Sequence, residues 1–388
     1  MIDNNILRYI ENKKEEMLVL LQTLVNIDSG TTFKMGVDRV GNIMSSKLEK
    51  EGFNIETIKQ AEYGNHIVAK KIGKGKGRIL LLGHMDTVFP EGTAKKRPFN
   101  IQGNRAYGPG VNDMKSGLVS LLYALKSLNT ECSSESGTIT VILNSNEEVG
   151  SPTSKPIIKE EAKKVDAVFV VEPAQPTGAV VTARKGIGIF KLQITGRAAH
   201  AGNNPSDGIS AIEELAHKII ELHKLNDLSS GITVNVGVIS GGSMRNTVAA
   251  QAFADIDLRI KTKEQSDEML KKLYKVAGKQ ALPGVEISLT GGINRPPMMK
   301  TQGTELLYSL VKEAGKVIGL NLNEAFPGGG SDGNFTAALG VPTIDGMGPV
   351  GGFSHGENEY LEIETVTERC KLLALSLVQV SRKGLTKV

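Results

Sequence analysis

The sequence is poor in several features that mark particular classes of protein. Its 388 residues include no tryptophan and only two cysteines, Cys132 and Cys370, which lie far apart with no CxxC or Cys/His cluster around them. This pattern argues against a disulfide-rich secreted scaffold and against a zinc site built on thiolates. We expect two reduced thiols in a cytoplasmic protein, with a single disulfide as the alternative.

An excess of one charge and long apolar runs are also lacking. The 46 basic residues against 42 acidic ones leave a net charge of only +4, so nucleic acid is not indicated as a partner. No run reaches the roughly 18 apolar residues of a membrane span. The start, MIDNNILRYIENKKEEM, lacks the basic end, apolar core and cleavage site of a signal peptide. These absences predict a cytoplasmic protein with no membrane partner.

What is present is typical of a globular chain with a large core. Hydrophobic residues make up 40% and charged ones 23%, and the length suggests two domains or one domain with an insertion. RILLLGHMDTV is a near-continuous apolar strand, as expected for a sheet covered on both faces. Helical LVSLLYALKSL and the strands GTITVILN and KVDAVFVVEP follow. The alternation predicts an α/β core.

The pattern changes near Gly178. AVVTARKG, GIFKLQITG, GITVNVGVISGG and AQAFADIDLRI are typical of half-buried strands, and helical runs near 208–225 and 263–277 interrupt them. This order predicts a smaller α/β sandwich inserted into the first domain. From about Pro296 the α/β character returns and ends in a helix over about 364–381. We therefore expect a discontinuous catalytic domain, residues 1–177 and 293–388, around an inserted domain, residues 178–292.

Side chains able to bind metals follow the predicted strands. In GHMDTV, His84 and Asp86 project to the same side because strand side chains alternate. Asp86 could therefore accept a hydrogen bond from the second ring nitrogen of His84 and fix its tautomer. Taken alone, the pair fits a buried structural histidine at a strand end equally well.

Four more stretches add carboxylates and a histidine. Asp113 in GPGVNDMKSG fits a helix N-cap by itself, and the Glu147–Glu148 pair in NSNEEVGS fits a charged loop. Glu172 ends the strand in VFVVEP, and His355 lies on the Gly-rich loop GGFSHGENEY. Together these residues are placed at the carboxyl edge of one sheet, where α/β folds build their sites.

The ordered series GHMDTV, GPGVNDMKSG, NSNEEVGS, VEP and FSHGENEY resembles a family of zinc metallopeptidases. That family holds aminoacylase, glutamate carboxypeptidase, tripeptidase T and succinyl-diaminopimelate desuccinylase, and the likeness is greatest to the glutamate carboxypeptidase branch. It covers essentially the whole chain. The resemblance implies a catalytic domain with a mixed sheet flanked by helices, an inserted α/β sandwich serving as dimerisation or lid domain, and a homodimer.

The resemblance also implies a role for each motif. Two Zn²⁺ ions per subunit, with Co²⁺ or Mn²⁺ as alternatives, are expected on His84, Asp113, Glu148, Glu172 and His355. Asp113 bridges the ions in this assignment, and Asp86 supports His84. Glu147 is expected to act as general base and then general acid.

In the inserted domain the resemblance singles out other residues. His200 in TGRAAHAGNNPSDG is expected to reach a neighbouring subunit's active site and to hold the carbonyl oxygen. Asn246 and Arg259 are candidates for binding a substrate carboxylate, although Arg259 could instead pair with Asp257 or Asp255 on the same strand. Gly329 and Gly330 are expected to line the substrate pocket by close backbone approach, since PGGGSDGNF lacks the Lys-Ser/Thr of a phosphate loop.

The favoured function is therefore a dinuclear zinc hydrolase of the carboxypeptidase type. It would cleave a peptide or amide bond next to a free carboxylate in a small peptide or an N-acyl amino acid. A tripeptidase, a dipeptidase and an N-acyl-amino-acid deacylase are alternatives on the same scaffold. A metal-binding relative without catalysis and a dinuclear phosphoesterase are disfavoured, because Glu147 is intact and a phosphate cradle is lacking.

Overall fold

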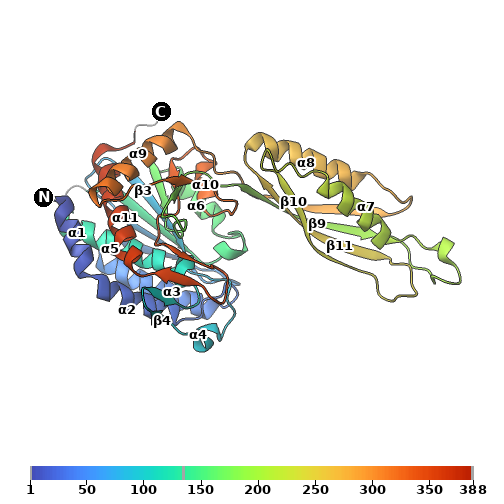
Figure 1. The fold of residues 1–388 in the computed structure, drawn as a ribbon, viewed down its shortest axis with the longest axis horizontal. Coiled ribbons are helices and arrows are strands. Elements are labelled where there is room, and N and C mark those ends of the chain that lie inside the picture. Colours follow the sequence, from blue (N-terminus) through green and yellow to red (C-terminus); the bar gives the residue numbers. More distant parts are fainter. Residues whose placement is uncertain (1, 133–135, 386–388) are drawn as a thin grey trace. The chain divides into compact units, whose positions relative to one another are not determined.

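A computed structural model describes residues 2–132 and 136–385. The chain divides into two compact units (Figure 1). Unit 1 holds the residues up to Ala183, Lys300–Pro327 and the residues from Ser331 onward. Unit 2 holds Arg184–Met299 and Gly328–Gly330. The chain therefore passes from unit 1 to unit 2 at Arg184, returns to unit 1 at Lys300, and later contributes the short segment Gly328–Gly330 to unit 2.

The described residues of unit 1 form helices and three sheets. Its helical segments are α1 (Ile2–Asn12), α2 (Lys14–Val25), α3 (Lys34–Lys50), α4 (Thr93–Lys96), η1 (Val111–Lys115), α5 (Ser116–Glu131), η2 (Glu147–Val149), α6 (Lys155–Ala162), α9 (Gln302–Val317), α10 (Gly333–Ala337) and α11 (Glu364–Lys383). Its strands are β1 (Asn54–Ile58), β2 (His66–Lys71), β3 (Arg78–His84), β4 (Asn100–Gln102), β5 (Arg105–Tyr107), β6 (Thr138–Asn144), β7 (Ala167–Val170), β8 (Val180–Val181), β13 (Glu324–Ala325), β14 (Thr343–Ile344), β15 (Gly351–Gly352) and β16 (Tyr360–Glu362).

The main sheet of unit 1 has six strands in the order β1-β2-β6-β3-β7-β14. β2 pairs antiparallel with both β1 and β6. The remaining neighbours in the sheet, β6, β3, β7 and β14, run parallel to one another. The sheet is therefore mixed, as the resemblance implied. His84 pairs with Asn144 and Leu82 with Val170, so the carboxyl ends of three parallel strands meet at one edge.

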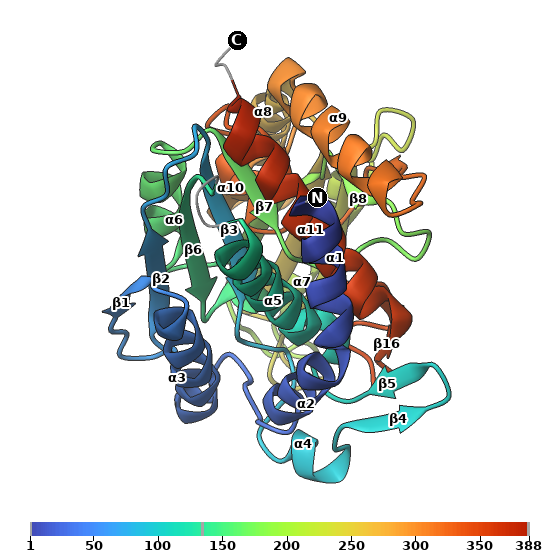
Figure 2. The ribbon, with the colours of Figure 1, turned by 90° about the vertical axis from the view of Figure 1, so that its left-hand side faces the viewer.

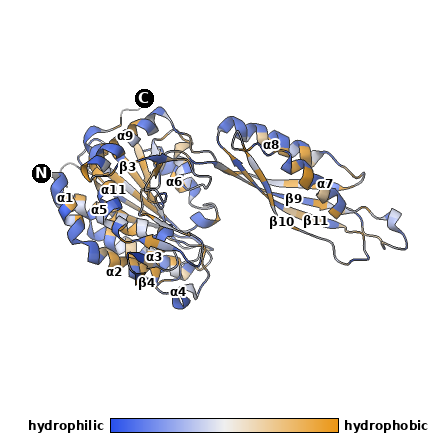
Figure 3. Cartoon of the chain, in the orientation of Figure 1, coloured by the Kyte–Doolittle hydropathy of each residue, from blue (hydrophilic) through white to orange (hydrophobic). Residues whose placement is uncertain are grey.

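Both faces of this sheet are buried, because alternate residues of the same strand point into different cores. Leu81 and Val141 pack into the large cluster with α5 and α11, which lie together with α1 on one face (Figure 2). Leu80 and Leu82 pack instead against α6 and α10. The apolar residues of the strands accordingly lie inside this unit, with polar helix faces outside (Figure 3). This burial explains the near-continuous apolar run in β3.

Unit 2 is a four-stranded antiparallel sheet covered on one face by two helices. Its elements are β9 (Gly186–Thr195), η3 (Pro205–Asp207), α7 (Ala211–His223), β10 (Thr233–Gly241), β11 (Gln251–Ile260), α8 (Lys263–Gly278) and β12 (Glu286–Arg295). The strand order is β10-β11-β9-β12. Alternate residues such as Phe190, Leu192 and Ile194 of β9 pack under α7 and α8. This two-layer α/β arrangement agrees with the sandwich fold expected for the insertion.

One predicted strand lies elsewhere. AVVTARKG was expected to open the inserted sheet, but only Val180 and Val181 form a strand, β8, which pairs in parallel with β13 inside unit 1. The sequence pattern there is that of a strand in either sheet, so it could not assign the partner. Among the described residues, no helix is both long and apolar enough to cross a membrane.

Candidate metal centre

Five segments converge at the carboxyl edge of the main sheet. His84 ends β3, the Glu147–Glu148 pair forms the short turn η2 after β6, and Glu172 follows β7. Asp113 lies in η1, directly before α5, and His355 lies between β15 and β16. All belong to unit 1. Parallel pairing of β3 with β6 and β7 brings together His84, Glu148 and Glu172. Asp113 and His355 reach the same place from other segments, so residues up to 271 positions apart, His84 to His355, meet there.

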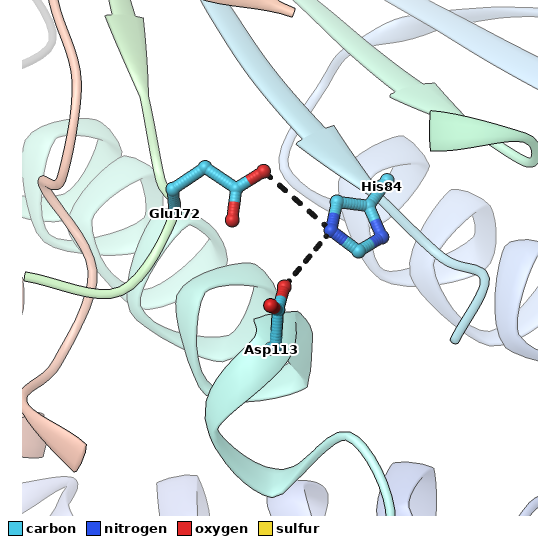
Figure 4. Close-up of side chains that lie close together, drawn as sticks. All are labelled: His84, Asp113 and Glu172. Carbon is cyan, nitrogen blue, oxygen red and sulfur yellow. Dashed lines mark hydrogen bonds and ion pairs between the residues drawn. The ribbon is translucent and has the colours of Figure 1, made fainter. Parts of the chain in front are cut away.

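The first group of possible ligands is His84, Asp113 and Glu172 (Figure 4). The Nε2 atom of His84 lies 3.2 Å from Oδ1 of Asp113 and 3.6 Å from Oε1 of Glu172. His84 is almost completely buried, and Glu172 is also buried. One imidazole nitrogen and two carboxylate oxygens therefore face a common point.

The second group is Asp113, Glu148 and His355. The Nε2 atom of His355 lies 3.3 Å from Oδ2 of Asp113 and 3.2 Å from Oε2 of Glu148. Asp113 belongs to both groups, and its two oxygens face different histidines. A carboxylate placed in this way can bridge two cations, one in each group.

The carboxylates of this buried centre disfavour ionisation of one another, because their negative charges repel. Burial raises the pKa of Glu172 well above its usual value, and the charge of Asp113 adds to the effect. Burial also raises the pKa of Glu148, although the hydrogen bond from His355 opposes it. Hydrogen bonds to Asp113 and Glu148 raise the pKa of His355 to about 10. A cationic partner would relieve this mutual repulsion.

The side chains present fit two divalent metal ions. Oε1 of Glu148 is buried, and it has no hydrogen-bond partner among the described residues. A buried carboxylate oxygen without a donor is costly unless a cation satisfies it. Each group offers one imidazole nitrogen and two carboxylates, a donor set that suits zinc and leaves room for a water ligand.

Asp86 connects the two sides of the centre. The backbone carbonyl oxygen of Asp86 lies 3.0 Å from Nδ1 of His84, closer than its Oδ1 at 3.5 Å. The closer contact is thus with the backbone, whereas the sequence had suggested the carboxylate. That carboxylate instead accepts hydrogen bonds from Thr31 Oγ1 at 2.7 Å and from the amides of Glu147 and Glu148 at 3.2 and 3.3 Å. Asp86 therefore orients His84 and the Glu147–Glu148 turn together.

A second supporting residue is Glu359, which stands four residues after His355 in the sequence. Its buried carboxylate accepts hydrogen bonds from the backbone amides of Gly110, Asn112 and Asp113 at 2.8, 2.9 and 2.9 Å. Burial raises its pKa to about 7, against the effect of these three donors. Glu359 therefore holds the loop that carries Asp113.

The remaining candidates lie in unit 2. His200 is exposed, and its Nδ1 accepts hydrogen bonds from the amides of Gly202 at 3.1 Å and Asn203 at 3.0 Å. With Nδ1 used as acceptor, the neutral ring carries its proton on Nε2, which is then a donor. Asn246 is exposed on the neighbouring segment, where its carbonyl accepts from the amide of Ala201 at 2.9 Å.

Arg259 on β11 is bound to a neighbouring side chain. Its Nε and Nη2 donate to the two carboxylate oxygens of Asp257 at 2.7 and 2.8 Å, the pairing that strand alternation had offered as the alternative. Its Nη1 also donates to the carbonyl of Gly328 at 3.3 Å. Arg259 is therefore joined to the glycine segment, within unit 2.

Gly329 and Gly330 differ in the space around their Cα atoms. A Cβ atom at Gly330 would lie 2.6 Å from Ile187 and 2.9 Å from Arg295, so a side chain there would clash. At Gly329 a Cβ would meet no atom within 4 Å. The carbonyl of Gly329 accepts a hydrogen bond from Nη1 of Arg184 at 3.2 Å. The space around the backbone thus explains glycine at 330 but not at 329.

The fold and this centre define a metallopeptidase. The model of peptidase family M20/M25/M40 matches residues 80–379, so the chain belongs to that family. The chain is 32% identical over 380 residues to carboxypeptidase G2 of Pseudomonas sp. (strain RS-16), covering 96% of this chain and 91% of that protein.

Solved structures share the fold. Aminopeptidase PepT from Bacillus cereus superimposes with a TM-score of 0.79 at 23% identity, covering 95% of this chain and 99% of that one. The YxeP protein of Bacillus subtilis, described as a dinuclear metal-binding peptidase of the M20 family, gives a TM-score of 0.68 at 18% identity, covering 96% and 99%.

Proposed function

We propose that this metallopeptidase is a dinuclear zinc exopeptidase of the carboxypeptidase type. It would hydrolyse a peptide or amide bond next to a free carboxylate, in a small peptide or an N-acyl amino acid. The observation that carries the proposal is Asp113, whose two oxygens face two separate histidines, each with a further carboxylate. The dinuclear description of the YxeP protein and the name of carboxypeptidase G2 support it.

Zinc is proposed as the metal, held by His84, Asp113, Glu172, Glu148 and His355, with Co²⁺ or Mn²⁺ as alternatives. When bound, the pair of ions would lower the pKa of a water molecule and polarise the scissile carbonyl group. The chain itself must then supply a group that moves protons, and five of the nearby acidic and imidazole side chains are already assigned to metal.

Glu147 is the residue to which we assign proton transfer. The backbone amide of Glu147 donates a hydrogen bond to the carboxylate of Asp86, and the negative charge of Glu147 contributes to the raised pKa of the buried Glu172. Glu147 is half-buried, so its carboxylate retains access to a substrate. In this role it takes a proton from the attacking water and later delivers it to the leaving amine nitrogen. The carboxylate of Asp86 accepts hydrogen bonds from the adjacent amides of Glu147 and Glu148, and so fixes the proposed base and the proposed ligand relative to each other.

Three residues of unit 2 are proposed to bind substrate. The Nε2–H of His200 would donate a hydrogen bond to the carbonyl oxygen, across the interface of a homodimer. Asn246 and Arg259 would bind the free carboxylate, with Gly329 and Gly330 lining the pocket; this requires Arg259 to share its guanidinium with Asp257.

Strand β10 supports a dimer: it is an edge strand, and Val238 and Ile239 on it are exposed. A cytoplasmic location remains part of the proposal.

The proposal is tested by a substrate panel after reconstitution with zinc. N-acyl amino acids, dipeptides with a blocked amine, and tripeptides with a free amine would be compared by the products released. We expect release of the C-terminal amino acid, glutamate among the preferred ones. Release of the N-terminal residue from tripeptides would instead show an aminopeptidase on this scaffold, and deacylation of N-acyl amino acids alone would show a deacylase.

A further inference from the structure

His66 is a buried histidine that the mechanism described above does not use. Its side chain is completely buried, and it is the first residue of β2, which pairs with β6 in the main sheet. Because Ile67 lies opposite Leu143, His66 lies beside the end of β6, where the chain enters the turn that carries Glu147 and Glu148. Burial lowers the pKa of the His66 ring to about 4, so the ring is neutral near pH 7.

Both ring nitrogens of His66 contact this turn, one near its start and one near its end. Nδ1 lies 3.3 Å from the amide nitrogen of Ser145 and 3.1 Å from its Oγ. Nε2 lies 2.8 Å from Oγ1 of Thr153. Ser145 precedes Glu147 by two residues, and Thr153 follows Glu148 by five. The ring therefore connects the two ends of the segment that carries the proposed base and the adjacent proposed ligand.

Asn146 joins the same network from within the turn. Its Nδ2 donates to Oγ1 of Thr153 at 2.7 Å, and its Oδ1 accepts from Oγ of Ser154 at 2.8 Å. A hydroxyl has two lone pairs and one proton, so Thr153 can accept from Asn146 and still bond Nε2 in either tautomer of the His66 ring. His66, Asn146 and Ser154 are buried. Buried polar groups are costly to leave without a partner, so the network resists opening.

The position of Glu147 depends on how firmly this turn is held. The helical part of the turn, η2, is only three residues long, Glu147–Val149. Asp86 binds the amides of Glu147 and Glu148, whereas His66 binds the two ends of the surrounding segment. A base must lie within hydrogen-bond reach of the water that it deprotonates, and a displacement of about 1 Å can cost about a hundredfold in rate.

We infer that His66 and Thr153 are positioning residues for Glu147: the hydrogen bond between them fixes the turn from which Glu147 reaches the attacking water. This inference rests on the proposed function, which assigns proton transfer to Glu147. Breaking the bond should slow turnover and leave substrate binding, which is assigned to unit 2, unchanged. The neighbouring Glu148 is held further by the metal once the protein is loaded, so the effect falls mainly on Glu147.

Turnover, KM and zinc content are measured in Thr153→Val, which keeps the shape of the side chain and removes its hydroxyl. On the substrate that the wild-type protein hydrolyses fastest, we expect kcat to fall about tenfold with KM unchanged and both zinc ions retained. Thr153→Ser, which keeps the hydroxyl, should restore most of kcat. In a His66→Phe background, Thr153→Val should cause little further loss, because the partner of the hydroxyl is already gone.

The matched control is Thr304→Val. Thr304 is buried in α9, outside the segments that carry the proposed ligands, and its Oγ1 lies 3.1 Å from Oγ1 of Thr301. The same chemical change therefore removes a hydroxyl contact from unit 1 without touching the turn. It should leave kcat unchanged.

Hydrogen exchange gives a second measurement that does not depend on catalysis. In metal-free Thr153→Val, amides in the segment 145–154 should exchange about tenfold faster than in the wild-type protein, while amides of α5 exchange at the wild-type rate. Unchanged exchange in the segment, unchanged kcat in zinc-loaded Thr153→Val, or an equal loss of kcat in Thr304→Val would overturn the inference. Failure of the proposed function appears separately, as a wild-type protein that hydrolyses no compound of the panel, and the exchange rates then decide whether the network holds the turn.

Discussion

Replacing Glu359 by alanine tests how the bridging carboxylate is held. The substitution leaves the backbone amides of Gly110, Asn112 and Asp113 without their buried acceptor. Each unsatisfied buried donor costs about 1–3 kcal/mol, and water entering the space recovers part of it, so we expect a loss of about 3 kcal/mol in the free energy of unfolding. Urea unfolding of the metal-free protein measures this loss.

The functional consequence should appear in metal affinity. Partners that orient a metal ligand are typically worth about 10–100-fold in metal binding. Because Asp113 faces both histidines, the loss should affect both sites, as measured by competition with a chromogenic chelator. Glu362→Ala is the control, since Glu362 pairs at the surface with Arg105 at 2.8 Å. Wild-type affinity at either site in Glu359→Ala would refute the role given to Glu359.

Three further outcomes are expected. Burial by itself would raise the pKa of Glu214, but the contacts with Lys218 and with the amides of Ala281 and Leu282 outweigh burial and lower that pKa. The ionised carboxylate therefore stabilises the fold at pH values above the ordinary carboxyl pKa, and this stabilisation is lost as the pH falls through the pKa of the folded state. Glu214→Gln should therefore cost about 3 kcal/mol of stability near pH 7 and much less in acid, by urea titration at both pH values; an equal loss at both would contradict this. Removing metal with a chelator should lower the unfolding temperature of unit 1 alone, because all five proposed ligands lie there. A uniform shift of both units in calorimetry would be inconsistent with that. Arg259→Gln should raise KM for N-acyl amino acids at least about tenfold with a smaller effect on kcat, as expected when a contact to the substrate carboxylate is lost. An unchanged KM would show that Arg259 does not bind the substrate and serves only to pair with Asp257.

The main sheet could be predicted from sequence because its strands are buried on both faces. That burial demands continuous apolar runs such as the one in β3, and parallel pairing then sends the residues after each strand to a common edge. His84, Glu148 and Glu172 needed no more than this to be placed together. Asp113 and His355 lie in irregular segments. The order of the motifs predicted that they lie at the same edge, and the resemblance of those motifs to a known family was needed to assign them to one metal centre.

Other features depend on contacts that no local pattern records. Glu359 stands four residues after His355, yet its carboxylate binds amides almost 250 positions earlier in the chain. Asp86 faces His84 with its backbone carbonyl, since the turn after β3 departs from strand geometry. Two valines, Val180 and Val181, suit either sheet equally, and only tertiary pairing with β13 decides between them. His66 resembles any buried histidine until its contacts with the turn after β6 are known.

The central claim is that Glu147 and Glu148 divide proton transfer and metal binding between adjacent side chains. Metal content and turnover are measured in parallel for Glu147→Gln and Glu148→Gln, which make the same chemical change one residue apart. We predict that Glu147→Gln keeps both zinc ions and loses turnover by at least about a hundredfold, the lower end of the usual contribution of general acid–base catalysis. Glu148→Gln should lose metal from the site shared with His355. Near-normal turnover in a fully loaded Glu147→Gln protein would contradict the account.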